Sequence, residues 1–197
     1  MWYRLLPKRI IAVALLSLVA LLGATSGTWA KTDVPDPQSS KRGQVKILDE
    51  IRKELVTLPW YDVFDWLEAE FRGDGTVVLR GETVRPTLKK DAEARVRKVE
   101  AVQKVINEIE VLPLSPNDDQ LRVALYRAIY KYDSPLFRYA TQAVPPIHII
   151  VKNGRVTLKG VVATEMDSQL AYTAARGVPG VFEVTNQLRV ENTRAER

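Results

Sequence analysis

The sequence contains no cysteine among its 197 residues. This absence excludes disulfide bonds, thiol catalysis, thiolate metal sites and a lipid-modified cysteine behind a signal peptide. Histidine is almost as scarce, because His148 is the only one. A single histidine lacks the companion residues that a metal site or a general base needs, so we interpret His148 as an ordinary strand residue.

The sequence also lacks the motifs of the common enzyme classes. It has no phosphate-binding glycine loop, no nucleophile elbow and no cluster of metal-ligating residues. Pairs of aspartate and glutamate occur, but we assign them to exposed helix and strand faces. We therefore expect no catalytic residues, no cofactor and no metal.

The first 30 residues follow the three-part pattern of a secretory signal. Arg4, Lys8 and Arg9 give a positive start, residues 10–22 are apolar, and residues 23–30 are small and polar. The apolar run is shorter than the roughly 20 residues of a membrane-spanning helix. We predict a signal peptide over residues 1–30 that is cleaved to leave an exported protein, with an uncleaved anchor as the alternative.

Removing this signal lowers the positive charge. The whole chain has a formal net charge of +5, of which the signal supplies three. The remaining excess is too small to predict a nucleic-acid partner, which an exported protein would rarely meet. Residues 31–43 are rich in proline and serine without apolar periodicity, so we predict a flexible linker there.

One stretch of the chain is present twice. Residues 74–111 and residues 153–190 share their glycine, valine and asparagine positions at a constant offset of 79 residues. Such self-similarity predicts two copies of one structural module. We place the first module at residues 44–113 and the second at residues 117–191, joined by a short proline-containing segment.

Periodicity predicts the same elements in each copy: a helix, a two-stranded hairpin, a second helix and a last strand. In the first hairpin, only a three-residue loop keeps apolar side chains on one face, which sets Phe71 opposite Val77. In the second, the turn at Asn153 and Gly154 sets Val151 opposite Val156. The predicted fold class is α+β, with two tandem αββαβ modules, each a small three-stranded mixed sheet packed on two helices.

The first helix of the second module carries the most informative pattern. We place it over residues 118–132, with the core stripe on Leu121, Ala124, Leu125, Ala128 and Tyr132. At about 100° per residue, the opposite side carries Val123, Tyr126 and Tyr130, flanked by Arg127 and Lys131. A long loop over residues 133–146 adds Phe137, Arg138 and Tyr139.

Two interpretations of this aromatic and cationic stripe stay open. Tyrosine rings and nearby cations suit the surface of an anionic bilayer. Alternatively, the stripe packs against the first module or a partner protein. Trp60 and Tyr61 in the first module pose a similar choice between a membrane or partner contact and a plug over the core, and we favour the plug.

The repeated elements resemble the BON domain. The segments that carry this resemblance run from Gly75 to Gly81 with Val99 to Asn107, and from Gly154 to Gly160 with Val178 to Asn186. BON modules are typical of osmotically induced periplasmic proteins and outer-membrane lipoproteins. The resemblance implies binding to anionic phospholipid or another envelope component without catalysis. Because cysteine is absent, membrane attachment would be peripheral.

These expectations combine into one functional hypothesis. The second module would dock on anionic phospholipid by shallow insertion of Tyr126 and Tyr130, in a role in envelope maintenance or stress. The expected lipid-binding residues are Val123, Tyr126, Arg127, Tyr130, Lys131, Phe137, Arg138 and Tyr139. The alternative is a protein-interaction or chaperone-like periplasmic adaptor that binds an envelope protein through the same stripe.

Overall fold

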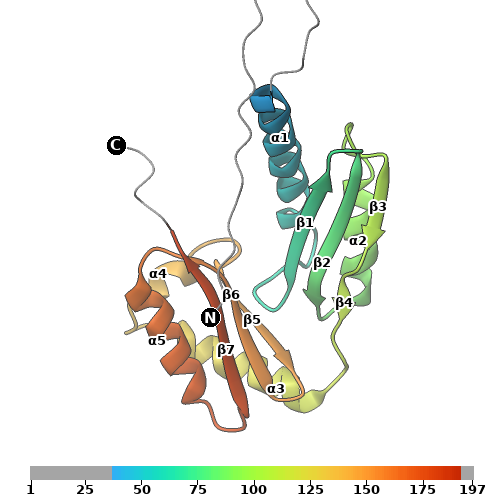
Figure 1. The fold of residues 1–197 in the computed structure, drawn as a ribbon. Coiled ribbons are helices and arrows are strands. Elements are labelled where there is room, and N and C mark those ends of the chain that lie inside the picture. Colours follow the sequence, from blue (N-terminus) through green and yellow to red (C-terminus); the bar gives the residue numbers. More distant parts are fainter. Residues whose placement is uncertain (1–36, 192–197) are drawn as a thin grey trace, which may run out of the picture. The chain divides into compact units, whose positions relative to one another are not determined.

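The computed structural model describes residues 37–191, with side chains from residue 42 onward (Figure 1). The predicted signal peptide and its cleavage site lie outside the described residues. Both predicted modules belong to the same compact unit of the chain.

The first module contains two helices and a mixed sheet. Its elements are α1 (Pro37–Val56), β1 (Trp66–Arg72), β2 (Thr76–Thr83), α2 (Pro86–Val96), β3 (Lys104–Asn107) and β4 (Glu110–Val111). β1 pairs antiparallel with β2, whereas β3 and β4 both pair parallel with β2. The last strand predicted for this module is therefore interrupted at Glu108 and Ile109. α1 and α2 cover the sheet around a core that includes Ile51, Leu79 and Ala92.

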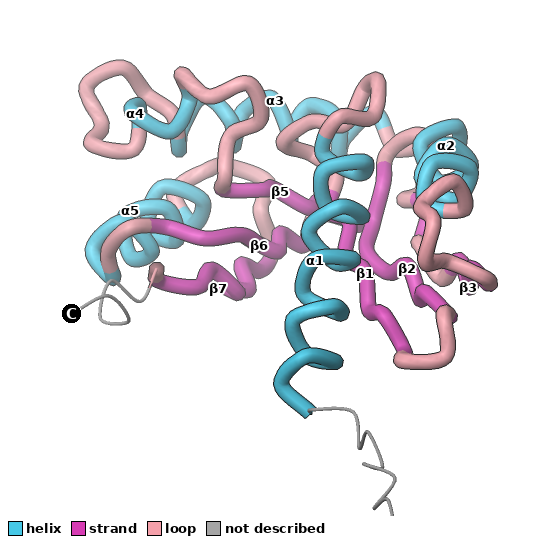
Figure 2. Tube along the Cα trace, turned by 90° about the horizontal axis from the view of Figure 1, so that it is seen from above, coloured by secondary structure: helices cyan, strands magenta, loops and turns pink. Residues whose placement is uncertain are grey.

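The second module repeats this arrangement. Its elements are α3 (Pro116–Ile129), α4 (Phe137–Ala140), β5 (Ile147–Lys152), β6 (Arg155–Val162), α5 (Glu165–Arg176) and β7 (Glu183–Val190). The strand order is β5-β6-β7, with the first pair antiparallel and the second parallel (Figure 2). The short helix α4 lies inside the predicted long loop. The predicted fold of two αββαβ modules is confirmed.

Both hairpin registers agree with the predicted ones. Phe71 lies opposite Val77, and Val151 lies opposite Val156. In the second hairpin, Asn153 and Gly154 have φ angles of 52° and 74°. Positive φ at both central residues is the requirement of a type I′ turn, so the Asn-Gly dipeptide sets the register as expected.

Two local predictions are wrong. α1 begins at Pro37, inside the predicted linker over residues 31–43, because proline is accepted at the start of a helix and Gly43 alone does not end one. The helical spacing of Met166, Leu170 and Ala174 predicts that Met166 lies in the core, but it is 66% exposed. Thr164 is the N-cap of α5, so Met166 lies in the first turn of the helix. The first buried residue of α5 is Asp167.

The segment between α1 and β1 joins the two modules. The amide of Ile149 donates a hydrogen bond to the carbonyl of Val63 at 2.8 Å. The Val63 side chain is buried in the core of the second module. Lys159 Nζ also lies 2.8 and 2.9 Å from the two carboxylate oxygens of Glu82. The modules therefore share apolar, backbone and ionic contacts.

Candidate functional site

α3 carries three of the eight predicted lipid-binding residues, and α4 carries three more. Its N-cap is Ser115, whose side chain accepts a hydrogen bond from the amide of Asp118 at 3.2 Å. The buried face consists of Leu121, Leu125 and Ile129, together with the polar residues Asp118 and Arg122. This face is rotated from the predicted stripe, which included Ala124 and Ala128 and omitted Ile129. Ala124 and Ala128 are consequently half-buried on the flanks of α3, and Ile129 belongs to its buried face.

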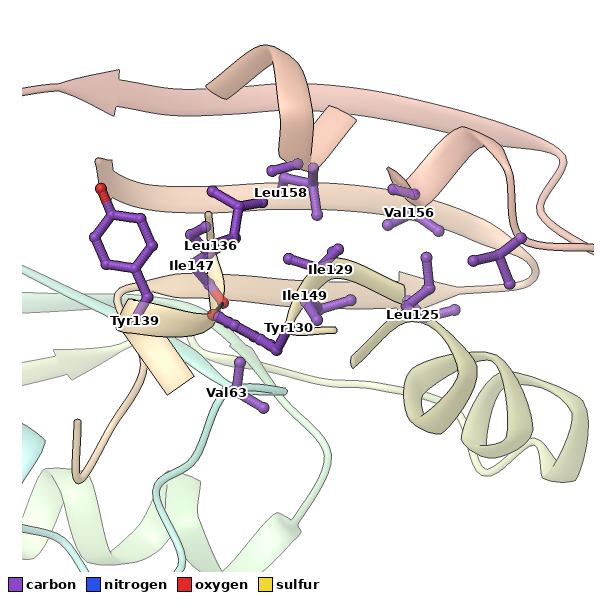
Figure 3. Close-up of a cluster of buried hydrophobic side chains, with 14 of the residues drawn as sticks. Val63, Leu125, Ile129, Tyr130, Leu136, Tyr139, Ile147, Ile149, Val156 and Leu158 are labelled. Carbon is purple, nitrogen blue, oxygen red and sulfur yellow. Dashed lines mark hydrogen bonds between the residues drawn. The ribbon is translucent and has the colours of Figure 1, made fainter. Parts of the chain in front are cut away.

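Tyr130 is buried, contrary to its predicted place on the outer stripe. Only 5% of the residue is exposed, and its hydroxyl donates to the carbonyl of Ile147 at 2.7 Å (Figure 3). The helical wheel correctly puts Tyr130 beside Tyr126, because the Tyr130 amide still donates to the Tyr126 carbonyl and the two rings lie 4.9 Å apart. The predicted exposure is wrong because Val63 of the first module packs in the same buried cluster. Burial raises the pKa of its hydroxyl well above the ordinary value.

Tyr126 contacts the first module. Its ring centroid lies 6.4 Å from that of Phe64 and 4.9 Å from that of Tyr130. Val63, beside Phe64 in sequence, belongs to the same buried cluster as Tyr130 (Figure 3). For Tyr126 and Tyr130, the structure therefore shows the alternative in which the stripe packs on the first module.

Tyr139 is also buried, with 7% of the residue exposed. Its hydroxyl accepts from the amide of Ala163 at 2.9 Å and donates to Asp167 Oδ2 at 3.0 Å. Arg138 donates to the same carboxylate oxygen at 2.6 Å. Burial opposes the charge of Asp167, but hydrogen bonds from Thr164 and Tyr139 and the Arg138 guanidinium hold its pKa below the usual range. Arg138 and Tyr139 thus fasten α4 to α5.

Five residues from the outer side of α3, the segment after it and the start of α4 form the remaining surface, which we call the α3 corner. Val123 is 45% exposed and Tyr132 is 84% exposed. Phe137 is half-buried, and its ring centroid lies 5.0 Å from that of Tyr132. Arg127 and Lys131 are exposed beside them.

Tyr132 is the residue that the sequence interpretation misplaced, because it was assigned to the core. The signal that could have revealed it is the turn-forming run Asp133-Ser134-Pro135 directly after it, which marks a helix that has already ended. Tyr132 instead stands outside the helix and contacts Phe137 of α4.

The first module has an exposed aromatic residue at the corresponding corner. Trp60 follows α1 and is 67% exposed, so the predicted plug over the core is wrong for this residue. Its φ of 70° lies in the left-handed region, which turns the side chain away from the core. The guanidinium of Arg85 lies 4.9 Å from the Trp60 ring centroid. Tyr61, in contrast, packs against the first core.

Three aspartates are buried rather than exposed as expected. Asp118 accepts hydrogen bonds from the amides of Asn153 and Gly154, each at 2.8 Å. Asp65 accepts from Thr83 Oγ1 and the Val84 amide, each at 2.8 Å, and burial raises its pKa. Together with Asp167, these carboxylates satisfy backbone and hydroxyl donors, which is a structural role.

His148 lies between the modules. It is 5% exposed, and its ring centroid is 5.6 Å from that of Tyr61 and 5.0 Å from that of Trp66. Burial lowers its pKa to about 4. Within residues 37–191, no cluster of histidine and carboxylate residues could hold a metal ion. The ring is therefore a neutral packing element at the junction.

Two open grooves border these features. One of about 910 Å³ lies between α1, β1 and the second module, and it is lined by residues that include Leu48, Trp66 and Val144. The other, of about 710 Å³, lies between α3 and the turn at Val178 and Pro179. Across the part of the chain described here, no helix is both long and apolar enough to span a membrane.

The two modules match one family description. The BON domain matches residues 46–113 and again residues 117–192. The chain belongs to the BON domain family. BON domains are generally non-enzymatic binding modules, and proteins that contain them are typically periplasmic or associated with the cell envelope. The chain is therefore a tandem BON protein, and the α3 corner belongs to its second module. The resemblance to the BON domain that the repeated glycine and valine pattern indicated is confirmed.

Comparison with other proteins adds little beyond the family. No curated protein sequence matches this chain. One similar solved structure is CdsD, a structural protein of the type III secretion system of Chlamydia trachomatis, with a TM-score of 0.30, 11% identity, and coverage of 74% of this chain and 92% of that chain. A second, the C-terminal domain of CdsD, has a TM-score of 0.28, 12% identity, and coverage of 75% and 98%. These scores are too low to support an argument about function.

Proposed function

We propose that this tandem BON protein binds peripherally to anionic phospholipid membranes of the cell envelope and that the α3 corner is its contact. The observation that carries this proposal is the exposure of Tyr132, at 84%. The ring stands against Phe137, beside the cations Arg127 and Lys131. Tyrosine favours the boundary between headgroups and water, and cations attract lipid phosphates.

The charges at the α3 corner are available to a lipid. Lys131 Nζ lies 2.7 Å from Asp133, but both side chains are at least 65% exposed. Such a surface ion pair contributes only about 0–1 kcal/mol, so a phosphate can replace Asp133. Arg127 forms no ion pair within residues 37–191. Each cation near an anionic surface contributes about 1 kcal/mol, which makes the attachment reversible.

The proposed insertion differs from the one predicted from sequence. Tyr132 and Phe137 would enter the headgroup region in place of Tyr126 and Tyr130, whose rings are occupied at the module junction. The hydrogen bond from Tyr130 to Ile147 holds the end of α3, and Arg138 and Tyr139 hold α4. Tyr126, Tyr130, Arg138 and Tyr139 thus position the corner. The other predicted residues, Val123, Arg127, Lys131 and Phe137, remain its proposed contacts.

Sedimentation with vesicles tests this function. The chain without residues 1–30 is mixed with phosphatidylcholine vesicles or with vesicles that also contain phosphatidylglycerol, at about 0.1 M and about 1 M salt. We expect sedimentation with the anionic vesicles only, and less of it at high salt because the charges are screened. Equal sedimentation with both vesicle types, or none with either, contradicts the proposal and favours a protein-binding adaptor.

A further inference from the structure

β7 forms an open edge of the second sheet. In the order β5-β6-β7, one side of β7 pairs with β6 (Figure 2). Its other side pairs with no strand in the part of the chain that the structure describes. An open edge presents backbone N–H and C=O groups that another strand can bind.

The hydrogen bonds show which residues of β7 face this open side. The amide of Glu191 donates to the carbonyl of Val162 on β6 at 2.8 Å, so the odd-numbered residues point toward β6. The even-numbered residues Val184, Asn186 and Leu188 therefore point their backbone groups outward. The Leu188 amide already donates to Asn186 Oδ1 at 3.1 Å. The backbone carbonyl of Leu188 and the backbone amide and carbonyl of Asn186 stay available to another strand.

Two other edges, at β5 and at β3 with β4, are less suited to pairing. The outer side of β5 is covered by the first module, where the Ile149 amide donates to the Val63 carbonyl. The counterpart of β7 in the first module is interrupted between β3 and β4. β7 instead keeps one continuous register with β6 from Glu183 to Val190, without a bulge that would twist the edge away.

The side chains of β7 are self-complementary about Asn186. If Asn186 lies opposite its copy in an antiparallel pair, Glu183 lies opposite Arg189 and Val184 lies opposite Leu188. Glu183 and Arg189 are exposed, whereas Val184 and Leu188 are half-buried and pack against the core. Opposite charges and matched apolar residues are the cross-strand pairs that stabilise a sheet.

We propose that two copies of this chain associate through β7, antiparallel about Asn186, to form one continuous sheet. The two-fold axis produces the pair of Glu183 with Arg189 twice. Glu183 already lies 3.3 Å from Arg155, but both side chains are more than 60% exposed, so this pair does not block the contact. The backbone bonds at Val184 and Asn186 form without displacing the Asn186 side chain from Leu188.

Charge exchange tests the association. Sedimentation velocity of the chain without residues 1–30, over a concentration series, is expected to show a monomer–dimer equilibrium. Arg189→Glu places like charges opposite each other and should raise the dissociation constant about tenfold. Glu183→Arg combined with Arg189→Glu should restore it, while Lys98→Glu, the same charge change on an exposed residue after α2, should leave it unchanged.

Two results of that experiment contradict the proposal. The first is a monomer at every concentration. The second is a double variant that stays folded by circular dichroism but associates no better than Arg189→Glu alone.

Cysteine cross-linking tests the register directly, since the chain has no cysteine of its own. In the proposed pairing Thr185 lies opposite Gln187 of the other copy, which brings their Cα atoms within disulfide distance. An oxidised mixture of Thr185→Cys and Gln187→Cys chains should form covalent heterodimers, whereas either variant alone should not. Equal cross-linking in the single-variant samples would exclude this register.

Discussion

Tyr130 and Tyr132 are two residues apart and have opposite roles. Tyr130 is 5% exposed and Tyr132 is 84% exposed. The difference arises because Tyr130, the C-cap of α3, packs in the cluster that includes Val63 of the first module, whereas Tyr132 lies beyond the end of the helix. Tyr130 therefore belongs to the fold, through Ile147, and Tyr132 belongs to the proposed membrane contact.

Replacing Tyr130 by phenylalanine should lower the free energy of unfolding. The variant removes the hydroxyl that donates to Ile147 while keeping the ring, so we expect a loss of about 1 kcal/mol. Urea denaturation measures it as a lower midpoint with an unchanged slope. Tyr132→Phe is the matched control, because its hydroxyl is exposed, and its stability should equal that of wild type. A Tyr130→Phe midpoint equal to wild type would show that the buried bond contributes nothing.

His148 should make stability depend on pH. Burial lowers its pKa from 6.5 to about 4 in the folded chain, so the unfolded chain binds the proton more readily between these values. The contribution is therefore fully present above pH 6.5 and is lost as the pH falls toward 4. The slope of the unfolding free energy over this window should be at most about 1.4 kcal/mol per pH unit.

Thermal or urea unfolding of wild type and His148→Phe between pH 7 and pH 4 checks this prediction. The phenylalanine ring keeps the contacts with Tyr61 and Trp66 but cannot titrate. The variant should lose less stability on acidification than wild type does. Parallel pH profiles would mean that His148 does not titrate differently on unfolding.

At the scale of the elements, the hairpins could be predicted from the sequence, whereas the buried face and the C-terminal end of α3 could not. Only one loop length puts Phe71 and Val77 on the same face, so alternation alone determines that register. Helical periodicity, in contrast, left two overlapping apolar stripes on α3, one with Ala124 and one with Ile129. Contacts from Val63 and Phe64, distant in sequence, decide between them, and no local pattern contains that information.

Gly160 of β6, which corresponds to Gly81 of β2 in the first module, shows why the repeated glycines specify the module. Gly160 has a φ of 128°, and a Cβ there would lie 1.8 Å from the carbonyl oxygen of Pro146. Gly160→Ala should therefore lower the free energy of unfolding by about 2–4 kcal/mol. Gly177→Ala is the control, since its φ is −76° and the nearest atom to a Cβ would be at 3.5 Å.

Differential scanning calorimetry of both glycine variants checks this prediction. Gly160→Ala should melt well below wild type, and Gly177→Ala should melt close to it. A Gly160→Ala protein that melts like wild type would show that the hairpin tolerates a side chain at this close approach.

At the scale of the whole molecule, the two BON modules share a scaffold but present different surfaces. The first module contributes Val63 and Phe64 to the second, which buries part of the predicted tyrosine stripe. Each module also exposes an aromatic residue that follows its first helix, Trp60 in the first module and Tyr132 in the second. Aromatic side chains with neighbouring cations suit a membrane surface, which is the basis of the proposed contact at the α3 corner.

The most direct test compares two exposed aromatic residues of the second module on anionic vesicles. Tyr132 is 84% exposed at the α3 corner, and Phe182 is 82% exposed before β7. Sedimentation with phosphatidylglycerol-containing vesicles is measured for wild type, Tyr132→Ser and Phe182→Ser, after circular dichroism shows that each is folded. We predict that Tyr132→Ser weakens binding about tenfold, as expected for loss of most of one inserted ring, and that Phe182→Ser binds like wild type. Full binding by Tyr132→Ser would contradict the assignment of the α3 corner as the membrane contact.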